Sequence, residues 1–368
     1  MSGSGKVGVG VIGAGVISKE YLGNLTRFPD VQVHAVGDLF PEAAKARAEE
    51  FGIAEHGSPD VVLNHPDIEI VVNLTIPAAH VEVATQAVNN GKHVWSEKPF
   101  STDRASGQEL LALAAAKGIR LGCAPDTFLG AGLQTARRML ERGDIGEPQS
   151  ALTLMQSPGP EAWHPNPAFL FQEGAGPLFD IGPYYLTALV QFFGSISRVG
   201  AFGSRSRLTR TIGSGPKAGE EFDVTVPTHV SAIAEFASGQ TSQSILSFDS
   251  FSGRPPLVEI TGTEGVLSVP DPNTFDGEIG IRGRNDDEWR TLPSVGSTDS
   301  RGTGVLELAR AIRADRPHRA PGEQAFHVVD AMTAITESID QKRFVDLESS
   351  VAAIPPLPED WDPTAETL

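Results

Sequence analysis

The first 125 residues alternate apolar, strand-like runs with helix-like segments, and this alternation restricts the possible folds more than any other feature. The strand-like runs are residues 7–13, 31–38, 69–75, 92–97 and 119–124, and the helix-like segments are 18–28, 41–52, 79–91 and 103–118. Strands that alternate with helices of about 10–15 residues are typical of a parallel sheet with helices on both faces. We therefore predict an α/β fold with a doubly wound parallel Rossmann domain over residues 1–125.

Beyond residue 125 the pattern changes to short β-branched or alternating runs. They are residues 150–156, 228–236, 241–248, 257–262 and 265–269, and turn residues separate them. Helix-like segments occupy 132–143, 304–315 and 322–341. The pattern predicts an α+β substrate and oligomerisation domain over residues 126–348, with a large, mostly antiparallel sheet. An extended, Pro-rich tail over residues 349–368 is expected to follow it.

Length and charge limit the class of protein. A chain of 368 residues is too long for one ordinary core, which agrees with two domains. Its 29 basic and 47 acidic residues give a net charge of −18, so no basic face is expected to bind nucleic acid or an anionic membrane. No apolar stretch is long enough to span a bilayer, and the N-terminus lacks the order of a secretory signal. These features predict a soluble, cytoplasmic protein with a small-molecule partner.

The single cysteine and the spacing of the histidines limit the chemistry further. With Cys123 alone, the chain has no intramolecular disulfide and no cysteine-based zinc site. Cys123 lies within an apolar run, so we expect it to be inert core packing. The histidines show no metal-ligand spacing, and no metal is expected.

A glycine loop follows the first predicted strand and opens the first predicted helix. It places Gly13 and Gly15 ahead of Val16 and Ile17, with Ser18 where a third glycine often stands. Glycines allow the backbone to approach a pyrophosphate, and the free N–H groups at the helix terminus bind the anion. In this context the loop predicts a bound dinucleotide; a glycine-rich turn without a ligand is the alternative.

Asp38 ends the second predicted strand, 25 residues after Gly13 (38 − 13 = 25). A carboxylate there can accept hydrogen bonds from both adenosine ribose hydroxyls, and its charge would repel a 2′-phosphate. The adjacent sequence offers no arginine that would favour NADP. We therefore expect NAD as the cofactor, with NADP disfavoured. The alternative is that Asp38 only caps the helix that follows.

Two further strands of this domain end in polar or proline-containing segments. One ends at Thr75, Ile76 and Pro77, and another ends in the stretch "VWSEKPF" (94–100), which contains Lys98. Ligands of such sheets bind at the carboxyl ends of the strands, so both segments are predicted to project into the cofactor crevice. This position favours a chemical role for Lys98 over an ordinary solvated turn.

These residues together resemble a known family. The loop 13–18, the segment 37–52, the stretch 73–100 and the later "GAGPLFDIGPYYL" (174–186) are similar to the Gfo/Idh/MocA oxidoreductases, named for glucose–fructose oxidoreductase and inositol dehydrogenase. The resemblance is nearly continuous over the N-terminal domain and covers the central motif of the second. The Glu-Lys-Pro triplet is its most specific part.

The resemblance implies roles for several residues. Lys98 would contact both the nicotinamide side of the cofactor and a substrate hydroxyl. Thr75, Pro77, His80 and Glu97 would help to position the cofactor. The large sheet of the second domain would form a homodimer or homotetramer.

The motif "DIGPYY" (180–185) departs from the pattern of much of this family, which has a histidine acid–base where Tyr184 stands here. It is similar to the branch of glucose–fructose oxidoreductase and dimeric dihydrodiol dehydrogenase, where a tyrosine has this role. A tyrosine pKa of about 10 is too high for a base at neutral pH, and the Lys98 ammonium nearby would lower it. Asp180 would lie on the same helix face and orient a sugar hydroxyl. Simple packing of Tyr184, and a helix-terminal carboxylate at Asp180, are the alternatives.

A Pro-rich loop, "SPGPEAWHPNP" (157–167), precedes this motif. Trp163 offers a face on which a sugar ring can stack, and His164 offers a polar group that could share the acid–base work. We interpret the loop as a wall of the substrate site; an ordinary packed loop is the alternative.

The leading hypothesis is an NAD-dependent oxidoreductase that transfers hydride between a nicotinamide cofactor and a sugar, a sugar derivative or a cyclic polyol. The resemblance implies the substrate class. A glycoside hydrolase that oxidises a sugar carbon transiently, eliminates the aglycone and reduces the product again stays open, because its cofactor loop and lysine look alike. A non-catalytic NAD-sensing regulator is disfavoured, since Lys98 and Tyr184 are both retained.

Overall fold

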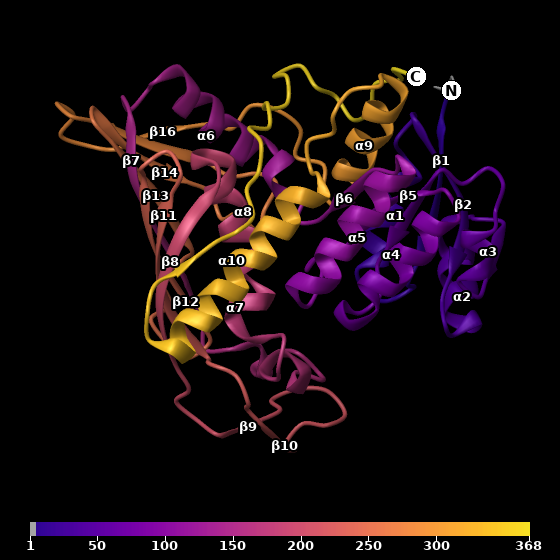
Figure 1. Ribbon diagram of the computed structural model, residues 1–368, viewed down its shortest axis with the longest axis horizontal. Helices are drawn as coiled ribbons and strands as arrows, with labels where there is room; N and C mark the ends of the chain where they lie inside the picture. Colours follow the sequence, from indigo (N-terminus) through magenta and orange to yellow (C-terminus); the bar gives the residue numbers. More distant parts are fainter. Residues whose placement is uncertain (1–4) are drawn as a thin grey trace. The chain divides into compact units, whose positions relative to one another are not determined.

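The structure, a computed structural model, describes residues 5–368, which divide into two compact units (Figure 1). The N-terminal unit holds residues 5–134, Val295–Val329 and Ile354–Leu368, and the C-terminal unit holds Thr135–Ser294 and Asp330–Ala353. This division differs from the predicted one, which had a single break at residue 125 and a separate tail. The chain instead returns twice to its N-terminal unit.

A parallel sheet forms the centre of the N-terminal unit. Within residues 5–368 it has six strands in the order β3-β2-β1-β4-β5-β6. They are β1 Val7–Ile12, β2 Val31–Gly37, β3 Glu55–Gly57, β4 Ile70–Asn73, β5 His93–Ser96 and β6 Leu121–Cys123. Every residue of β1 and β4 is buried, as expected of a parallel sheet with both faces covered. The strand order reverses beside β1, and the predicted Rossmann domain is confirmed.

The helices of this unit begin and end at residues suited to those positions. They are α1 Ser18–Leu25, α2 Pro41–Phe51, α3 Asp60–Leu63, α4 His80–Asn89, α5 Arg104–Lys117 and α9 Thr303–Arg313. Pro41 is the first residue of α2, and Gly52 follows its end with a left-handed φ of 68°. Asp103 caps α5, where its side chain accepts a hydrogen bond from the Ser106 N–H at 2.8 Å. These local signals explain why the predicted helices lie within a few residues of the observed ones.

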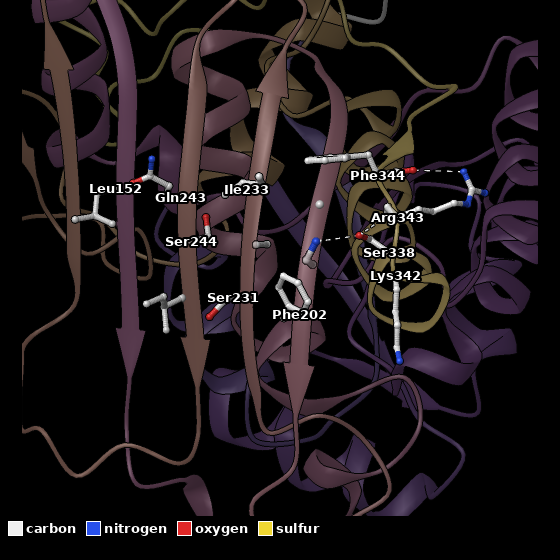
Figure 2. Close-up of a pocket in the computed structure, with 14 residues that line it drawn as sticks. Leu152, Phe202, Ser231, Ile233, Gln243, Ser244, Ser338, Lys342, Arg343 and Phe344 are labelled. Atoms are coloured by element: carbon white, nitrogen blue, oxygen red, sulfur yellow. Dashed lines mark hydrogen bonds between the residues drawn. The ribbon is translucent and has the colours of Figure 1, made fainter.

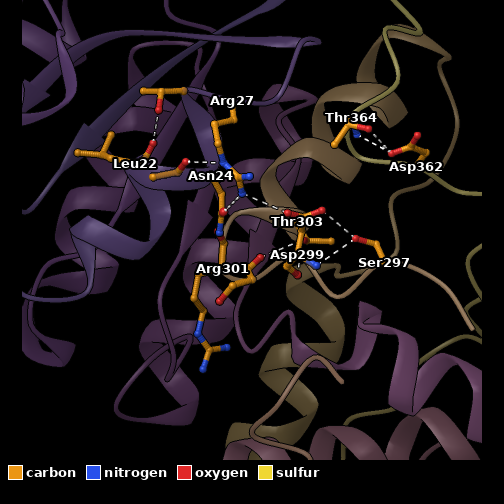
Figure 3. A network of polar contacts seen from close by, with 12 residues as sticks. Leu22, Asn24, Arg27, Ser297, Asp299, Arg301, Thr303, Asp362 and Thr364 are labelled. Carbon is orange, nitrogen blue, oxygen red and sulfur yellow. Dashed lines mark hydrogen bonds and ion pairs between the residues drawn. The ribbon is translucent and has the colours of Figure 1, made fainter. Parts of the chain in front are cut away.

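The segment before α9 is bound to α1 by polar contacts (Figure 3). The Asn24 side chain donates to the Arg301 carbonyl at 2.8 Å, and the Arg27 guanidinium donates to the Asp299 carboxylate at 3.1 Å. Behind these contacts Gly304 packs against the Trp95 ring, where an added Cβ would come within 1.9 Å of a ring carbon. Contacts between residues more than 200 positions apart therefore place this late segment in the N-terminal unit.

The last residues of the chain supply hydrogen-bond partners to a buried ion pair. The Arg310 guanidinium donates to the Asp30 carboxylate at 2.7 Å, and both side chains are almost fully buried. Arg310 also donates to the carbonyls of Asp362 and Ala365, while the Thr367 N–H donates to Asp30 at 2.8 Å. A buried pair is stable only where its remaining donors and acceptors find partners. The tail supplies them, which is why it packs on the N-terminal unit.

Cys123, at the end of β6, is a buried structural residue. It is 4% exposed, and its thiol donates to the Ala124 carbonyl at 3.2 Å. Burial, with a smaller contribution from the Glu97 carboxylate, raises the pKa of this thiol well above its ordinary value. The thiol therefore stays protonated, in agreement with its predicted role in packing.

The C-terminal unit contains a large mixed sheet of nine strands, counted within residues 5–368, in the order β16-β15-β14-β13-β7-β12-β11-β8-β17. The strands are β7 Pro148–Gln156, β8 Ile196–Ser204, β11 His229–Phe236, β12 Thr241–Ser247, β13 Leu257–Gly262, β14 Gly265–Val269, β15 Ile279–Gly283, β16 Arg290–Leu292 and β17 Val345–Asp346. Only β7 and β12 pair in parallel within this sheet of the described chain. A small hairpin, β9 Thr209–Thr211 and β10 Glu221–Asp223, lies apart from it. The predicted, mostly antiparallel sheet is confirmed.

Helices lie on one face of this sheet (Figure 1). They are α7 Gly176–Asp180 and α8 Gly182–Phe193, with parts of α6 Ala131–Arg142 and α10 Gly322–Gln341. Gly182, the first residue of α8, lies close to the sheet, since a Cβ added there would come within 3.4 Å of the Leu246 side chain of β12. Among residues 5–368, none of the helices is both long and apolar enough to cross a membrane.

Candidate active site

The carboxyl ends of β1, β4 and β5 gather the predicted cofactor residues at one edge of the N-terminal sheet. Gly13 follows β1, Thr75 follows β4 after one residue, and Glu97 follows β5 directly. β1 pairs with β2 on one side and with β4 on the other, so the strand order reverses here. A ligand of a doubly wound sheet binds at such an edge.

The glycine loop has the backbone that a diphosphate requires. Gly13 has a φ of 105°, and a Cβ there would come within 2.6 Å of the Leu74 carbonyl. The Ser18 hydroxyl donates to the Gly15 carbonyl at 2.6 Å and begins α1. The N–H groups of Gly15, Val16 and Ile17 have no hydrogen-bond partner within residues 5–368. They are therefore available to an anion at the start of the helix.

Asp38 lies against this loop. One oxygen of its carboxylate accepts from the Ala14 N–H at 2.7 Å, and the other accepts from the Phe40 N–H at 2.8 Å. The alternative role as the cap of α2 is not observed, because the residue before the helix is Phe40 and no side chain caps it. The half-buried carboxylate thus lies between the end of β2 and the glycine loop, and its role in ribose recognition stays a prediction.

His80 holds two loops together from a buried position. Its side chain is 1% exposed, and its ring nitrogens lie 2.7 Å from the Pro99 carbonyl and 3.0 Å from the Thr75 carbonyl. The backbone after β4 is thereby joined to the backbone after β5. Pro77, which begins a short 3₁₀ turn, is exposed at the same edge. His80 is consequently a positioning residue, since it is too buried to touch a ligand.

A chain of hydrogen bonds holds the backbone of Lys98. The Trp95 indole donates to the Tyr21 hydroxyl at 3.2 Å, and Tyr21 donates to the Glu97 carboxylate at 2.8 Å. The other oxygen of Glu97 accepts from the Lys98 N–H at 3.0 Å. Burial first, then the Glu97 charge, raise the pKa of Tyr21 well above its ordinary value, so its hydroxyl remains a donor.

Glu97 thus holds the backbone at Lys98, and the Lys98 side chain is half-buried at the sheet edge. The peptide bond between Lys98 and Pro99 is cis. The sequence did not indicate Tyr21, because its hydroxyl meets Glu97 across 76 positions of the chain.

In the C-terminal unit the motif 180–185 forms two helices where one was expected. α7 ends at Asp180, and α8 begins at Gly182. Pro183 lacks the N–H that a continuous helix would need, so the hydrogen bonds are interrupted at this point. The expected common helix face of Asp180 and Tyr184 is therefore not formed. Tyr184 is 8% exposed in the first turn of α8, and Asp180 is half-buried.

Tyr184 belongs to the C-terminal unit and Lys98 to the N-terminal unit. Their proximity therefore stays a prediction. The neighbouring Tyr185 is 1% exposed, and its hydroxyl donates to the Asp271 carboxylate at 3.3 Å. Burial, and then Asp271, raise the pKa of Tyr185 far above its ordinary value. Tyr185 is thus a structural tyrosine.

Residues 157–171, the aromatic loop, present three rings in series. Trp163 is 69% exposed and meets His164 edge-on at 5.6 Å between centroids, and His164 meets Phe169 at 5.6 Å. The Nδ1 atom of His164 accepts from the Asn166 N–H at 3.1 Å, so the other ring nitrogen carries the proton of the neutral ring. Phe169 was missed because it reads as part of an apolar run. Exposed aromatic faces of this kind can stack against a sugar ring.

Arg210, on β9, fixes the aromatic loop in place. It is 3% exposed and pairs with Glu161 of the loop and with Asp249. It also donates to the Pro158 carbonyl at 3.1 Å and covers the Phe171 ring at 4.8 Å. Burying this charge is possible because carboxylates and carbonyls surround it. No local pattern in the sequence indicates Arg210, since its partners lie 38 to 52 positions away.

Within residues 5–368, no three histidine, cysteine, aspartate or glutamate side chains lie close enough together to hold a metal ion.

Two family models match the chain and agree with this arrangement. Residues 7–124 match the Gfo/Idh/MocA oxidoreductase family with an NAD-binding Rossmann fold, and residues 133–268 match the Gfo/Idh/MocA C-terminal domain. The chain belongs to the Gfo/Idh/MocA oxidoreductase family. Its N-terminal unit is the NAD-binding domain, and the glycine loop holds the groups that fit this cofactor.

Among relatives of known name, the chain is 30% identical over 236 residues to a dTDP-3,4-didehydro-2,6-dideoxy-alpha-D-glucose 3-reductase of Streptomyces antibioticus. The matched region covers 62% of this chain and 68% of the relative. The chain is 26% identical over 310 residues to a trans-1,2-dihydrobenzene-1,2-diol dehydrogenase of Xenopus tropicalis, covering 83% and 87%. Uncharacterised oxidoreductases of Bacillus subtilis and Schizosaccharomyces pombe are matched over only 45% and 41% of their own lengths.

The fold is also that of solved family members. A levoglucosan dehydrogenase in complex with NADH and L-sorbose superposes with a TM-score of 0.82, with 21% identity over 94% of this chain and 99% of that one. An NAD-binding oxidoreductase from Klebsiella pneumoniae superposes with a TM-score of 0.83, with 23% identity over 94% and 100%. At these identities the likeness shows the fold.

The position of Asp38 predicts the choice of cofactor. We expect the wild-type protein to bind NAD more tightly than NADP. Asp38→Ser should weaken NAD binding about tenfold, because ~1.4 kcal/mol of charged hydrogen bonding is lost, and should thereby reduce the difference in affinity between NAD and NADP. Calorimetric titration of both cofactors measures this. Asp67→Ser, which removes an exposed carboxylate before β4 at the opposite edge of the sheet, is the matched control. Tighter binding of NADP by the wild-type protein would contradict the role of Asp38.

Proposed function

We propose that this protein is an NAD-dependent dehydrogenase that transfers hydride between the cofactor and a ring carbon of a sugar, a sugar derivative or a cyclic polyol. The main support is the kind of relative that it matches over most of its length. A dTDP-sugar reductase and a dihydrodiol dehydrogenase both have names that describe oxidation or reduction at a hydroxyl-bearing ring carbon. NAD bound at the edge of the N-terminal sheet would be the hydride acceptor.

Lys98 and Tyr184 would carry the proton transfer. As hydride leaves the substrate carbon, the proton of its hydroxyl must leave too, and the Tyr184 oxygen accepts it. The Lys98 ammonium favours the phenolate form of Tyr184 and stabilises negative charge on the substrate oxygen. The hydrogen bond from the Lys98 N–H to the Glu97 carboxylate supports this role because it holds the backbone of the lysine at the sheet edge. Asp180 would orient a second hydroxyl of the ring.

The aromatic loop would form a wall for the substrate. The exposed Trp163 and Phe169 offer faces on which the apolar side of a sugar ring can stack. His164, between them, offers one N–H to a ring hydroxyl. The rigid support of this loop by Arg210 favours a fixed wall over a mobile one.

We further propose that two copies associate through the uncovered face of the C-terminal sheet (Figure 2). On this face Gln243 lies between Leu152 of β7 and Ile233 of β11, and Phe344 lies over Gly200. The residues line a mostly apolar hollow of about 490 Å³. Exposed apolar side chains gathered on one sheet face are unusual for a monomer, and a twofold-related copy would cover them.

Oxidation assays test the proposed reaction. We expect one or more anhydrosugars, aldoses, inositols or vicinal cyclic diols to reduce NAD, with NADH absorbance rising at every turnover. Aryl glycosides assayed in heavy water test the glycoside hydrolase alternative. Release of the aglycone with deuterium in the sugar and no net NADH would replace the dehydrogenase by that alternative. Binding of NAD without turnover of any of these compounds would favour the regulator.

Substitutions test the paired roles of Lys98 and Tyr184. We expect Lys98→Ala and Tyr184→Phe each to lower kcat by about 10²–10⁴-fold, since both remove acid–base chemistry, with the Kd of NAD changed only a few-fold. Because the two residues act together, the double variant should be little worse than the worse single variant. Tyr185→Phe, which removes the adjacent structural hydroxyl, should keep kcat within a few-fold. Near-normal turnover in Tyr184→Phe would move the acid–base role to His164 or to Lys98 alone.

The mass in solution tests the association of two copies. We expect light scattering of the wild-type protein to give an even multiple of the 39.0 kDa chain. Phe202→Glu should halve this mass, because it places a charge on the apolar face. Phe202 is 80% exposed on the proposed interface. Phe251→Glu is the control, since this ring is 78% exposed on a loop away from the hollow. A wild-type protein with the mass of one chain would contradict the proposed interface.

A further inference from the structure

Arg47 reaches from α2 back to the glycine loop. It lies on the second turn of the helix, where a charged residue would ordinarily face solvent, yet its side chain is only 12% exposed. Its Nη2 atom lies 3.3 Å from the carbonyl oxygens of both Ala14 and Gly15. Its Nη1 atom lies 2.5 Å from the Glu50 carboxylate. One nitrogen of the guanidinium therefore contacts both carbonyls of the cofactor loop, while another pairs with Glu50.

Ala14 is consequently held from two sides. Its N–H donates to the Asp38 carboxylate, which comes from the end of β2, and its carbonyl faces Arg47, which comes from α2. Asp38 was expected from the sequence as a ribose ligand, whereas Arg47 stands 33 positions from Ala14. The two opposite charges act on one residue of the loop.

The direction of the carbonyls determines the direction of the next amides. In a planar trans peptide, the C=O of one residue and the N–H of the following residue point in opposite directions. Because the carbonyls of Ala14 and Gly15 turn toward Arg47, the N–H groups of Gly15 and Val16 turn away from it. These same N–H groups have no partner within residues 5–368. They are the donors that a diphosphate would meet.

We propose that Arg47 is a positioning residue for cofactor binding: it fixes the carbonyls of Ala14 and Gly15 so that the adjacent amides face the diphosphate of NAD. Glycine has more backbone freedom to lose than any other residue, and the loop contains Gly13 and Gly15. Holding the loop in advance lowers this cost. The inference depends on the NAD-binding domain and is independent of the proposed substrate.

The main competing explanation is that the positive charge of Arg47 attracts the anionic cofactor from a distance. Lys19 can distinguish this explanation from the positioning role. Lys19 lies on α1, is 56% exposed and pairs with the same Glu50 carboxylate at 2.9 Å. Lys19→Met and Arg47→Met each remove one positive charge beside Glu50. Only Arg47 contacts the loop carbonyls among these two residues of the described chain. Lys19→Met is therefore the matched control.

Calorimetric titration with NAD and with ADP-ribose measures the effect. We expect Arg47→Met to weaken both ligands about fivefold to tenfold, as the loss of two long charge-assisted hydrogen bonds implies, and Lys19→Met to change them less than twofold. Arg47→Lys keeps the charge but replaces the planar guanidinium, which contacts the loop carbonyls and Glu50 at once, by one ammonium group, so it should lie between the wild type and Arg47→Met. Unchanged binding in Arg47→Met would overturn the proposal. Equal losses in Arg47→Met and Lys19→Met that disappear at high salt would overturn it in favour of charge attraction.

Hydrogen exchange of the protein without ligand separates loop positioning from helix stability. In Arg47→Met we expect faster exchange in a peptide covering residues 13–18, with exchange in residues 41–52 and the melting temperature close to those of the wild type. Faster exchange in 41–52 together with a lower melting temperature would show that Arg47 only stabilises α2, and would overturn the proposal. Because neither measurement uses a substrate, both outcomes leave the proposed reaction to be decided by its own assays.

Discussion

The close approach of the loop after β1 to the backbone after β4 is the constraint on which the cofactor site depends. At Gly13 the carbonyl of Leu74 leaves no room for a side chain, and the positive φ turns the chain toward α1. This contact places the glycine loop at the sheet edge where the strand order reverses. The loop then meets Asp38 from β2 on one side and the end of β4 on the other. An alanine at Gly13 would disturb all of these contacts at once.

Most of the polar side chains around this edge act on the backbone. His80 joins the loops after β4 and β5, and Glu97 binds the Lys98 N–H while Tyr21 holds Glu97. Asp38 binds a backbone N–H of the glycine loop. Several buried or half-buried groups keep the backbone of Lys98, which follows β5, in one conformation. Preorganisation of this kind lowers the entropic cost of binding and of chemistry.

The C-terminal unit uses a related solution for its own loop. Arg210 is buried between two carboxylates and lies over an aromatic ring, and removing either carboxylate would leave a buried charge short of a partner. The aromatic loop therefore has a defined shape even though Trp163 at its tip is largely exposed. The sheet of this unit shows the reverse case, since its helix-free face carries Phe202, which is 80% exposed, and Ile233, which is 47% exposed.

Local signals in the sequence were sufficient for the elements and for the cofactor loop. Periodicity located most strands and helices of the N-terminal unit, Pro41 and Gly52 marked the ends of α2, and the glycine spacing marked the loop. The resemblance to the family pointed to Lys98 for the same reason, because its motif is contiguous. These features depend on neighbours within a few residues, so the sequence by itself determined them.

Tertiary structure decided whatever depends on residues far apart in the chain. The tail joined the N-terminal unit because Asp30 and Arg310, 280 positions apart, needed further partners. Arg47, Tyr21 and Arg210 gained their roles from contacts that no local pattern records. The motif 180–185 became two helices because Pro183 removed a hydrogen bond that periodicity cannot register. Local preferences are encoded in adjacent residues, whereas the satisfaction of buried charges and donors depends on which distant segments the fold brings together.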